Sequence, residues 1–348
     1  MTTQFLDPRA PNTRLLLVDT HHDVVAESTV TRLSQLLTPR DLLVVNDAAT
    51  LPASLFGRTA RGDEVEVRLL EGPYESITRA VLFGRGDYHT PTELREAPPR
   101  LAVGDTVEIG ARHLTVCSVS SLSPRLVELS WSSDAQARFA LLYGAGRPVQ
   151  YSYVSQPLAL WDVQTTFAAR PWAVEMPSAA RPLSGAVLLA LRARGVPIAH
   201  LTHAAGLSAT GDQAIDAALP LPERYELPER TVHAVEQTHG RGGRVVAVGT
   251  SVVRALEDSA QRHGSLRAGV ATAELVLDQG TVPRVVSGLL TGIHVPGESH
   301  YRLLAAFTRA ETLARAAARA AEQGYRGHEF GDAALFLPDV LQRARHAA

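Results

Sequence analysis

The chain has 348 residues, of which 45% are hydrophobic and 20% charged, a composition typical of a globular protein of about two domains. Its formal net charge of -2 gives no general attraction for nucleic acid, and the absence of lysine excludes a lysine Schiff base or a P-loop lysine. A single cysteine excludes an internal disulfide and a multi-cysteine metal site.

We expect no targeting signal in the N-terminal segment, because no basic stretch there is followed by an apolar one. No apolar segment approaches the roughly 18 residues that a membrane span needs. We therefore expect a cytoplasmic protein with no membrane partner.

The first predicted elements are two short apolar strands, residues 15–18 and 42–45, with a helix over 31–37 between them. From residue 57 to 146 the pattern changes to short alternating segments separated by glycines, which indicates antiparallel strands. These segments are residues 64–70, 77–83, 106–109, 114–119 and 126–131. We expect this region to form a small all-β barrel or sandwich.

After Pro148 helices and strands alternate again. Ser184 is a suitable cap for a helix that Gly195 ends, and Pro228 suits the first turn of another helix. The predicted strands are residues 198–202 and 244–248, and the predicted helices are 184–194, 228–239, 251–262 and 303–323. The fold class we predict is an α/β (α+β) catalytic domain, residues 1–56 and 147–348, with an inserted all-β barrel domain, residues 57–146.

Residues 240–257 place Gly249, Thr250 and Ser251 between an apolar strand and a helix. The backbone N–H groups at such a helix start favour a carboxylate or phosphate, although an ordinary helix cap is the alternative. A polar loop with His294 and His300 follows the apolar segment 285–290, and loops at strand ends are where α/β proteins bind ligands. Each histidine has either a catalytic or a structural role.

Two further segments are less specific. His200 and His203 lack a third ligand in the sequence nearby, so no zinc site is expected. Residues 324–336 hold several polar side chains in a glycine-broken turn, which is either a solvated loop or part of a site. From these residues alone the reaction stays unnamed.

Seven segments, in this order, resemble the S-adenosylmethionine:tRNA ribosyltransferase-isomerases of queuosine biosynthesis. They are residues 41–57, 61–71, 163–180, 223–231, 242–257, 289–299 and 325–336. The resemblance implies the same two-domain fold. It also implies that the ribosyl part of S-adenosylmethionine is transferred to a 7-aminomethyl-7-deazaguanine (preQ1) base in tRNA and rearranged. S-adenosylmethionine is then a substrate, and no metal is expected.

The resemblance also implies the site. His294, Asp47 and Asp332 are the candidate catalytic residues, and Thr250 and Arg254 are candidates for holding the methionine carboxylate. The candidate substrate-binding residues are Asn46, Gln164, Thr165, Ser178, His203, Glu223, Gly249, Thr250, Arg254, Thr291, Pro296, Tyr325, Arg326 and Gly331. S-adenosylmethionine is expected near Thr250, Thr291 and His294.

The chain departs from the family pattern at several polar positions. Ala48 and Ala49 replace Thr-Arg, Ser54 replaces a second arginine, and residues 327–330, Gly-His-Glu-Phe, replace Phe-Phe-Ser-Tyr. Each lost hydrogen bond to a buried polar group costs about 1 to 3 kcal/mol. The acceptor therefore stays open between preQ1-tRNA and a small molecule, and a non-catalytic relative is the third reading.

Overall fold

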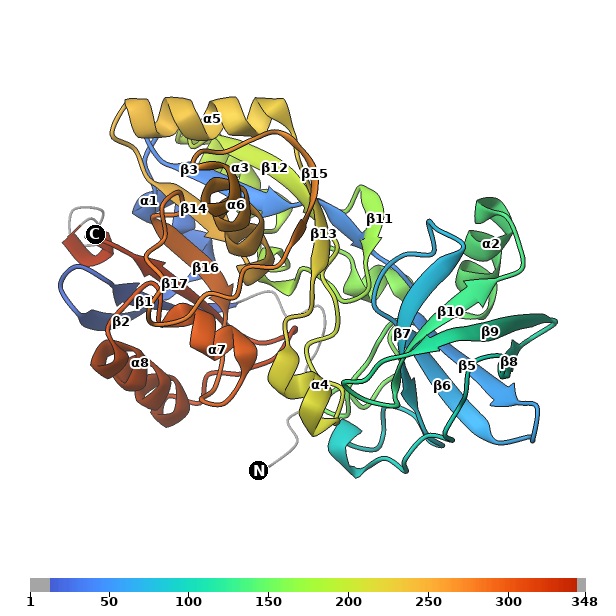
Figure 1. The fold of residues 1–348 in the computed structure, drawn as a ribbon. Helices are drawn as coiled ribbons and strands as arrows, with labels where there is room; N and C mark the ends of the chain where they lie inside the picture. Colours follow the sequence, from blue (N-terminus) through green and yellow to red (C-terminus); the bar gives the residue numbers. More distant parts are fainter. Residues whose placement is uncertain (1–12, 343–348) are drawn as a thin grey trace.

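The computed structural model describes residues 13–342 and contains a large mixed sheet and a closed barrel (Figure 1). The sheet has nine strands in the order β15-β13-β12-β3-β14-β16-β17-β1-β2. The six barrel strands follow the order β10-β7-β6-β5-β8-β9. This arrangement confirms the predicted α/β fold with an inserted all-β barrel.

The centre of the sheet consists of four parallel strands, β12 (Ile198–His203), β3 (Leu42–Asn46), β14 (Val245–Val248) and β16 (Gly288–Gly292). The next strand, β17 (Ala333–Leu337), is antiparallel to β16, and β1 (Arg14–Asp19) is parallel to β17. The edges are completed by β2 (Val24–Thr29) on one side and by β13 (Glu223–Leu227) and β15 (Gly269–Ala273) on the other.

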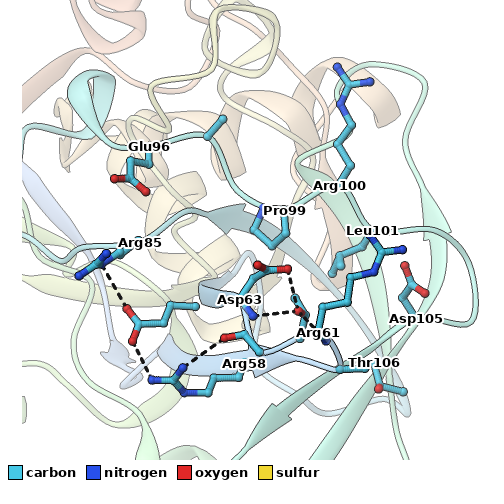
Figure 2. A pocket seen from close by; sticks show the side chains of 15 residues that line it. Arg58, Arg61, Asp63, Arg85, Glu96, Pro99, Arg100, Leu101, Asp105 and Thr106 are labelled. Carbon is cyan, nitrogen blue, oxygen red and sulfur yellow. Dashed lines mark hydrogen bonds and ion pairs between the residues drawn. The ribbon is translucent and has the colours of Figure 1, made fainter.

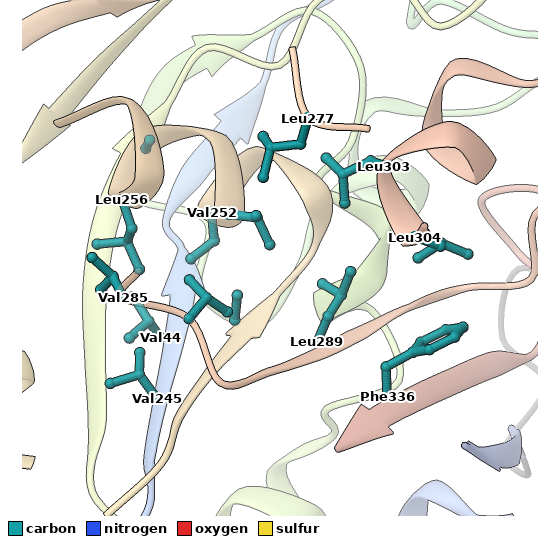
Figure 3. Close-up of a cluster of buried hydrophobic side chains, with 14 of the residues drawn as sticks. Val44, Val245, Val252, Leu256, Leu277, Val285, Leu289, Leu303, Leu304 and Phe336 are labelled. Atoms are coloured by element: carbon teal, nitrogen blue, oxygen red, sulfur yellow. The ribbon is translucent and has the colours of Figure 1, made fainter. Parts of the chain in front are cut away.

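Helices cover both faces of this sheet because its central strands are apolar on both sides. In β3, Leu42 and Val44 face one buried cluster, whereas Leu43 and Val45 face another. The first cluster is packed by α5 (Glu229–Gly240), α6 (Thr250–His263), α7 (Ser299–Leu304) and α8 (Ala310–Glu322), as Figure 3 shows in part. The second is packed by α1 (Leu33–Leu36) and α3 (Gly185–Ala193).

The barrel is formed by β5 (Ser54–Thr59), β6 (Glu64–Leu69), β7 (Ile77–Phe83), β8 (Thr106–Ile109), β9 (Arg112–Val119) and β10 (Leu126–Trp131). Helix α2 (Ala135–Ala145) follows, with Asp134 as its N-cap. The barrel core also includes Val174, Leu207 and Ile215 from the larger domain. The barrel therefore packs against the α/β domain, and the independence of residues 57–146 stays a prediction.

Buried polar groups also occupy the barrel. Arg68 and Glu66 are 1% and 2% exposed, and Arg68 Nε lies 2.6 Å from Glu66 Oε1. Ser54 Oγ donates to the same carboxylate at 2.7 Å. Paired in this way, the charges of Arg68 and Glu66 lose less on burial than isolated charges would.

The helix predicted over residues 303–323 is instead two helices, α7 and α8. The amides of Ala305, Ala306 and Phe307 bond to carbonyls three residues back, which tightens and ends α7. The carboxylate of Asp23 then binds Arg309 and Thr312 at the start of α8, at 2.9 and 2.8 Å. A tertiary contact therefore sets this break.

Three short elements connect the two parts. Strands β4 (Ala48–Thr50) and β11 (Arg170–Ala173) form a separate parallel pair, and α4 (Gln213–Ala218) packs its Ile215 into the barrel core. Among residues 13–342, no helix is long and apolar enough to cross a membrane.

Candidate active site

The carboxyl ends of β3, β12, β14 and β16 meet at one edge of the sheet because these four strands are parallel. Asn46 ends β3, His203 ends β12, Gly249 follows β14, and Thr291 lies at the end of β16. Ligand sites of α/β proteins lie at such edges. We name the edge formed by these four residues the strand-end site.

Asn46 holds neighbouring segments of the strand-end site together through side-chain hydrogen bonds. Its Oδ1 accepts hydrogen bonds from the amides of Ala48 and His203, at 3.0 and 2.9 Å. Its Nδ2 donates to His203 O at 2.9 Å and to Ser251 Oγ at 3.4 Å. Since Asn46 is fully buried and its donors and acceptor are engaged, it positions the strand ends and has no group left for a ligand.

The start of helix α6 offers unoccupied donors to the strand-end site. Gly249 has φ 95°, a conformation that favours glycine, and no side chain in the described part of the chain caps the helix. The amides of the first turn of α6 therefore lack side-chain acceptors, and Thr250 and Ser251 are half-buried beside them. Ala179, which follows Ser178, lies nearby: its Cβ would lie 3.4 Å from a Cβ on Gly249. This arrangement suits a carboxylate or phosphate.

His294 is held by contacts to both ring nitrogens. Its Nε2 lies 2.9 Å from Thr291 Oγ1, and its Nδ1 lies 3.5 Å from Glu298 Oε2. Burial raises the pKa of Glu298, but hydrogen bonds from His294 and from the Val295 amide outweigh it and hold this pKa below the usual value. Glu298 is therefore an anion that orients His294.

His300 stacks on His294, with ring centroids 5.0 Å apart and an interplanar angle of 14°. Burial, and then the charge of His294, lower the pKa of His300 to about 3. His300 is therefore neutral at physiological pH, and the pair presents one histidine able to take a proton without stacking two cations.

At the end of β12, His203 is fully buried, and among residues 13–342 neither of its ring nitrogens has a hydrogen-bond partner. Burial and the charge of Arg254 hold its pKa well below the usual value. Arg254 pairs with Glu223 and also donates to the carbonyls of Leu221, Leu275 and Ala273 at 3.1 to 3.2 Å. The Arg254 guanidinium therefore mainly ties helix α6 to the β13 and β15 edge of the sheet.

The turn before β17 is built around Asp332. Its two carboxylate oxygens accept the amides of Arg14 and Arg326, at 3.0 and 2.9 Å, and it is 3% exposed. Arg14 also lies over the Tyr325 ring, 3.8 Å from its centroid. Gly331 is required here, because a Cβ would lie 2.1 Å from the Gly327 carbonyl oxygen. The sequence resemblance predicted Asp332, Tyr325, Arg326 and Gly331 as site residues. In the structure, their contacts stabilise this turn.

The remaining predicted residues lie around the strand-end site. Asp47 follows β3 and accepts from Thr202 Oγ1 at 2.6 Å. Gln164 uses both ends of its amide on the backbone of Thr50, at 2.9 Å each, and Thr165 is buried beside it. Pro296 is exposed in the His294 loop. Of these, Asp47 keeps a half-buried carboxylate at the strand ends.

A group of side chains outside the predicted set adjoins the His294 loop. His328 is exposed and stacks on Tyr153 with ring centroids 4.0 Å apart. Glu329 lines a cavity of about 20 Å³ together with Glu175 and Tyr151, and burial raises its pKa to about 7. His328 and Glu329 are visible in sequence as departures from the family pattern, whereas Glu175 and Tyr151 carry no such signal.

A cavity of about 720 Å³ lies on the barrel, and its lining includes none of the strand-end residues (Figure 2). Its charged lining comprises Arg58, Arg61, Arg85, Arg100, Asp63, Glu64, Glu96 and Asp105. The four arginines are balanced by four carboxylates, and Glu64 pairs with both Arg58 and Arg85, at 2.7 and 3.7 Å. With no net charge, this cavity is a weaker anion site than the α6 start.

Known proteins resemble this chain along most of its length. The family model described as queuosine biosynthesis protein matches residues 4–336. The S-adenosylmethionine:tRNA ribosyltransferase-isomerase of Gloeobacter violaceus is 35% identical over 317 residues, which covers 87% of this chain and 83% of that relative. The Acidiphilium cryptum protein of the same name is 33% identical and covers 94% of each chain.

A solved structure, the S-adenosylmethionine tRNA ribosyltransferase of Thermotoga maritima, superposes with a TM-score of 0.52. It is 22% identical and covers 96% of this chain and 95% of its own, so the likeness concerns the fold. The family match and the identities of the relatives agree. The chain belongs to the queuosine biosynthesis protein family.

Proposed function

We propose that this protein is a cytoplasmic enzyme that transfers the ribosyl part of S-adenosylmethionine to a preQ1 base in tRNA and rearranges it to an epoxycyclopentanediol. The observation that carries the proposal is that the uncapped start of α6 and the oriented His294 lie at the same strand ends. Membership of the family supports the reaction. Adenine and methionine are the expected leaving products.

The sulfonium charge supplies most of the driving force, because it acidifies the adjacent C5′ proton and makes methionine a good leaving group. The protein then has to hold the substrate and move a proton. His294 is our candidate for the group that moves this proton, since Glu298 and Thr291 fix its ring and His300 beside it stays neutral. Asp47 is our candidate for accepting hydrogen bonds from the ribose hydroxyls, because it has a half-buried carboxylate at the strand ends.

The methionine carboxylate is best placed at the start of α6, near Thr250. An anion there interacts favourably with the helix dipole and with the free first-turn amides. Arg254, the other sequence candidate for this carboxylate, is largely occupied by Glu223 and by three carbonyls. We therefore assign Arg254, Asp332 and Asn46 to positioning.

The acceptor base is best placed against His328. Its ring stacks on Tyr153 and is exposed, which provides a flat surface for a nucleobase. The neighbouring Gly327 packs close to the His294 loop, since a Cβ on it would lie 3.4 Å from the Ile293 carbonyl oxygen, which supports a position of this surface near the proposed proton-transfer group.

The proposal is tested by incubating the protein with S-adenosylmethionine and preQ1-tRNA, digesting the tRNA and measuring its nucleosides by mass spectrometry. We expect the mass of preQ1 to increase by that of the rearranged ribosyl group, with release of adenine and methionine. Consumption of S-adenosylmethionine at the same rate without tRNA, and unchanged tRNA, would show a small-molecule acceptor or hydrolysis.

A further inference from the structure

Two histidines and an aspartate from opposite ends of the described chain meet at the edge of the sheet away from the strand-end site. His21 and His22 lie in the turn between β1 and β2, and Asp339 follows β17. Strand β17 is antiparallel to β16, so its carboxyl end lies at the opposite edge. The nitrogen and oxygen atoms of this group lie within 4.8 Å of one another.

The distances fit the spacing of ligands around one ion. Asp339 Oδ1 lies 2.9 Å from His21 Nδ1 and 3.5 Å from His22 Nδ1. Zinc binds nitrogen and oxygen ligands at about 2.0 to 2.2 Å, which puts neighbouring ligands of a tetrahedron about 3.3 Å apart. The three side chains therefore need little rearrangement to bind a single ion, and solvent has access to the fourth position, because His21 and His22 are exposed.

A buried carboxylate holds the backbone of all three residues. Asp19 is 1% exposed, and its Oδ1 accepts the amides of His21, His22 and Asp339 at 3.1 to 3.2 Å. Its Oδ2 accepts the amide of Leu341 at 3.2 Å. Asp19 Oδ1 also lies 3.2 Å from His22 Nδ1, so a second carboxylate adjoins this group of three side chains. Such outer groups orient metal ligands and increase affinity.

We propose that His21, His22 and Asp339 form a binding site for a divalent transition-metal ion, of which zinc is the best match. Imidazole and carboxylate ligands suit zinc and its neighbours, whereas calcium and magnesium prefer oxygen alone. The ion would connect the β1–β2 turn to the segment after β17 and so stabilise the far edge of the sheet. This proposal departs from the sequence expectation of no metal, because the ligands are more than three hundred residues apart.

The test uses tag-free, chelator-treated protein titrated with zinc chloride by calorimetry, with thermal unfolding measured in parallel. We expect one zinc ion per chain and a higher unfolding midpoint with zinc, because an ion bound only by the folded state stabilises it. His22→Ala and Asp339→Asn should each reduce zinc affinity by about tenfold or more, and the zinc-dependent rise in midpoint should be lost. All three side chains are outside the core, so these variants should fold.

The matched control is His89→Ala. His89 is also exposed and lies 2.7 Å from a carboxylate, that of Asp87, but these two residues have no third ligand beside them among residues 13–342. This variant should bind zinc as the wild type does. The proposal is overturned if the wild type binds no zinc, or if a variant with both His21→Ala and His22→Ala binds it as tightly, which would place the ion elsewhere, for example at Cys117.

Discussion

At the scale of single residues, polar side chains of the same type have different roles according to which of their atoms are already bonded. Both carboxylate oxygens of Asp332 accept backbone amides, whereas Glu329 Oε2 is buried with no hydrogen-bond partner among residues 13–342. Sequence resemblance placed Asp332 among the catalytic candidates, since a motif identifies a residue but not its bonds. Two predictions separate these roles.

The first concerns Asp332→Asn. An asparagine has one acceptor oxygen, so one of the two amides loses its partner, which costs about 1 to 3 kcal/mol of unfolding free energy. We expect a lower thermal midpoint and a turnover number, per folded molecule, within a few-fold of the wild type. A loss of turnover of a hundredfold or more at unchanged stability would show that Asp332 is a catalytic residue.

The second prediction concerns the pH dependence of stability. Burial raises the pKa of Glu329 from 4.5 to about 7 in the folded protein. Below the lower value the carboxyl is protonated in both states; between the two values only the unfolded state ionises, so stability falls as pH rises and levels off above the folded pKa. This difference corresponds to roughly 3 to 4 kcal/mol of unfolding free energy.

Glu329→Gln removes this ionisation. We expect the thermal midpoint of the variant, relative to the wild type, to be higher at about pH 8 than at about pH 5. Glu311→Gln, an exposed change on α8, should show no such difference between the two pH values. Equal effects of Glu329→Gln at both pH values would mean that the carboxyl is hydrated and ionises normally.

At the scale of elements, periodicity and caps predicted the parts of the fold whose stability is local. The barrel strands β6 to β10, together with β12, β14 and α3 with its Ser184 cap, lie where expected, whereas the barrel strand β5 was not predicted. The break between α7 and α8 and the strands β13, β15 and β17 were missed, because distant contacts decide them: Asp23 fixes the break, and β17 pairs with β1 and β16. In the same way, the strand-end motifs were visible in sequence, but their bonding was not.

One such distant contact is testable at Glu257 of α6. This carboxylate is 3% exposed and accepts the amides of Arg284, Val285 and Val286 at 2.8 to 3.0 Å, just before β16. Glu257→Gln should reduce the unfolding free energy by about 2 kcal/mol or more. The charge-assisted hydrogen bonds are lost, and the glutamine NH2 group points at a backbone N–H that also donates. The exposed Glu236→Gln on α5 should change it by less than about 0.5 kcal/mol. Equal thermal midpoints for these two variants would contradict this account.

At the scale of the whole molecule, the charge distribution bears on how tRNA is bound. The net charge is -2, and the arginines of the large barrel cavity are balanced by carboxylates. Arg181 lies over Phe330, with 5.0 Å to the ring centroid, and is one arginine near the proposed acceptor surface. Recognition of the modified base, and not a broad basic surface, should therefore provide most of the selectivity.

The corresponding prediction is a shallow salt dependence of tRNA binding. Each phosphate contact contributes a slope of about 0.7 to 0.9 to log K against log salt, so a few contacts give a slope of about 2 to 3. Anisotropy with preQ1-tRNA over a salt series measures it. A slope above about 5 would show that arginines on the barrel or elsewhere form an extended phosphate-binding surface.

The central claim is that the strand-end site carries out the ribosyl transfer, with His294 moving the proton. Single-turnover transfer to preQ1-tRNA, measured for the wild type and His294→Gln alongside S-adenosylmethionine affinity by calorimetry, tests it most directly. We predict that the variant binds S-adenosylmethionine within a few-fold of the wild type and transfers about 10² to 10⁴ times more slowly, the usual contribution of a positioned acid or base. A transfer rate within a few-fold of the wild type would contradict the account.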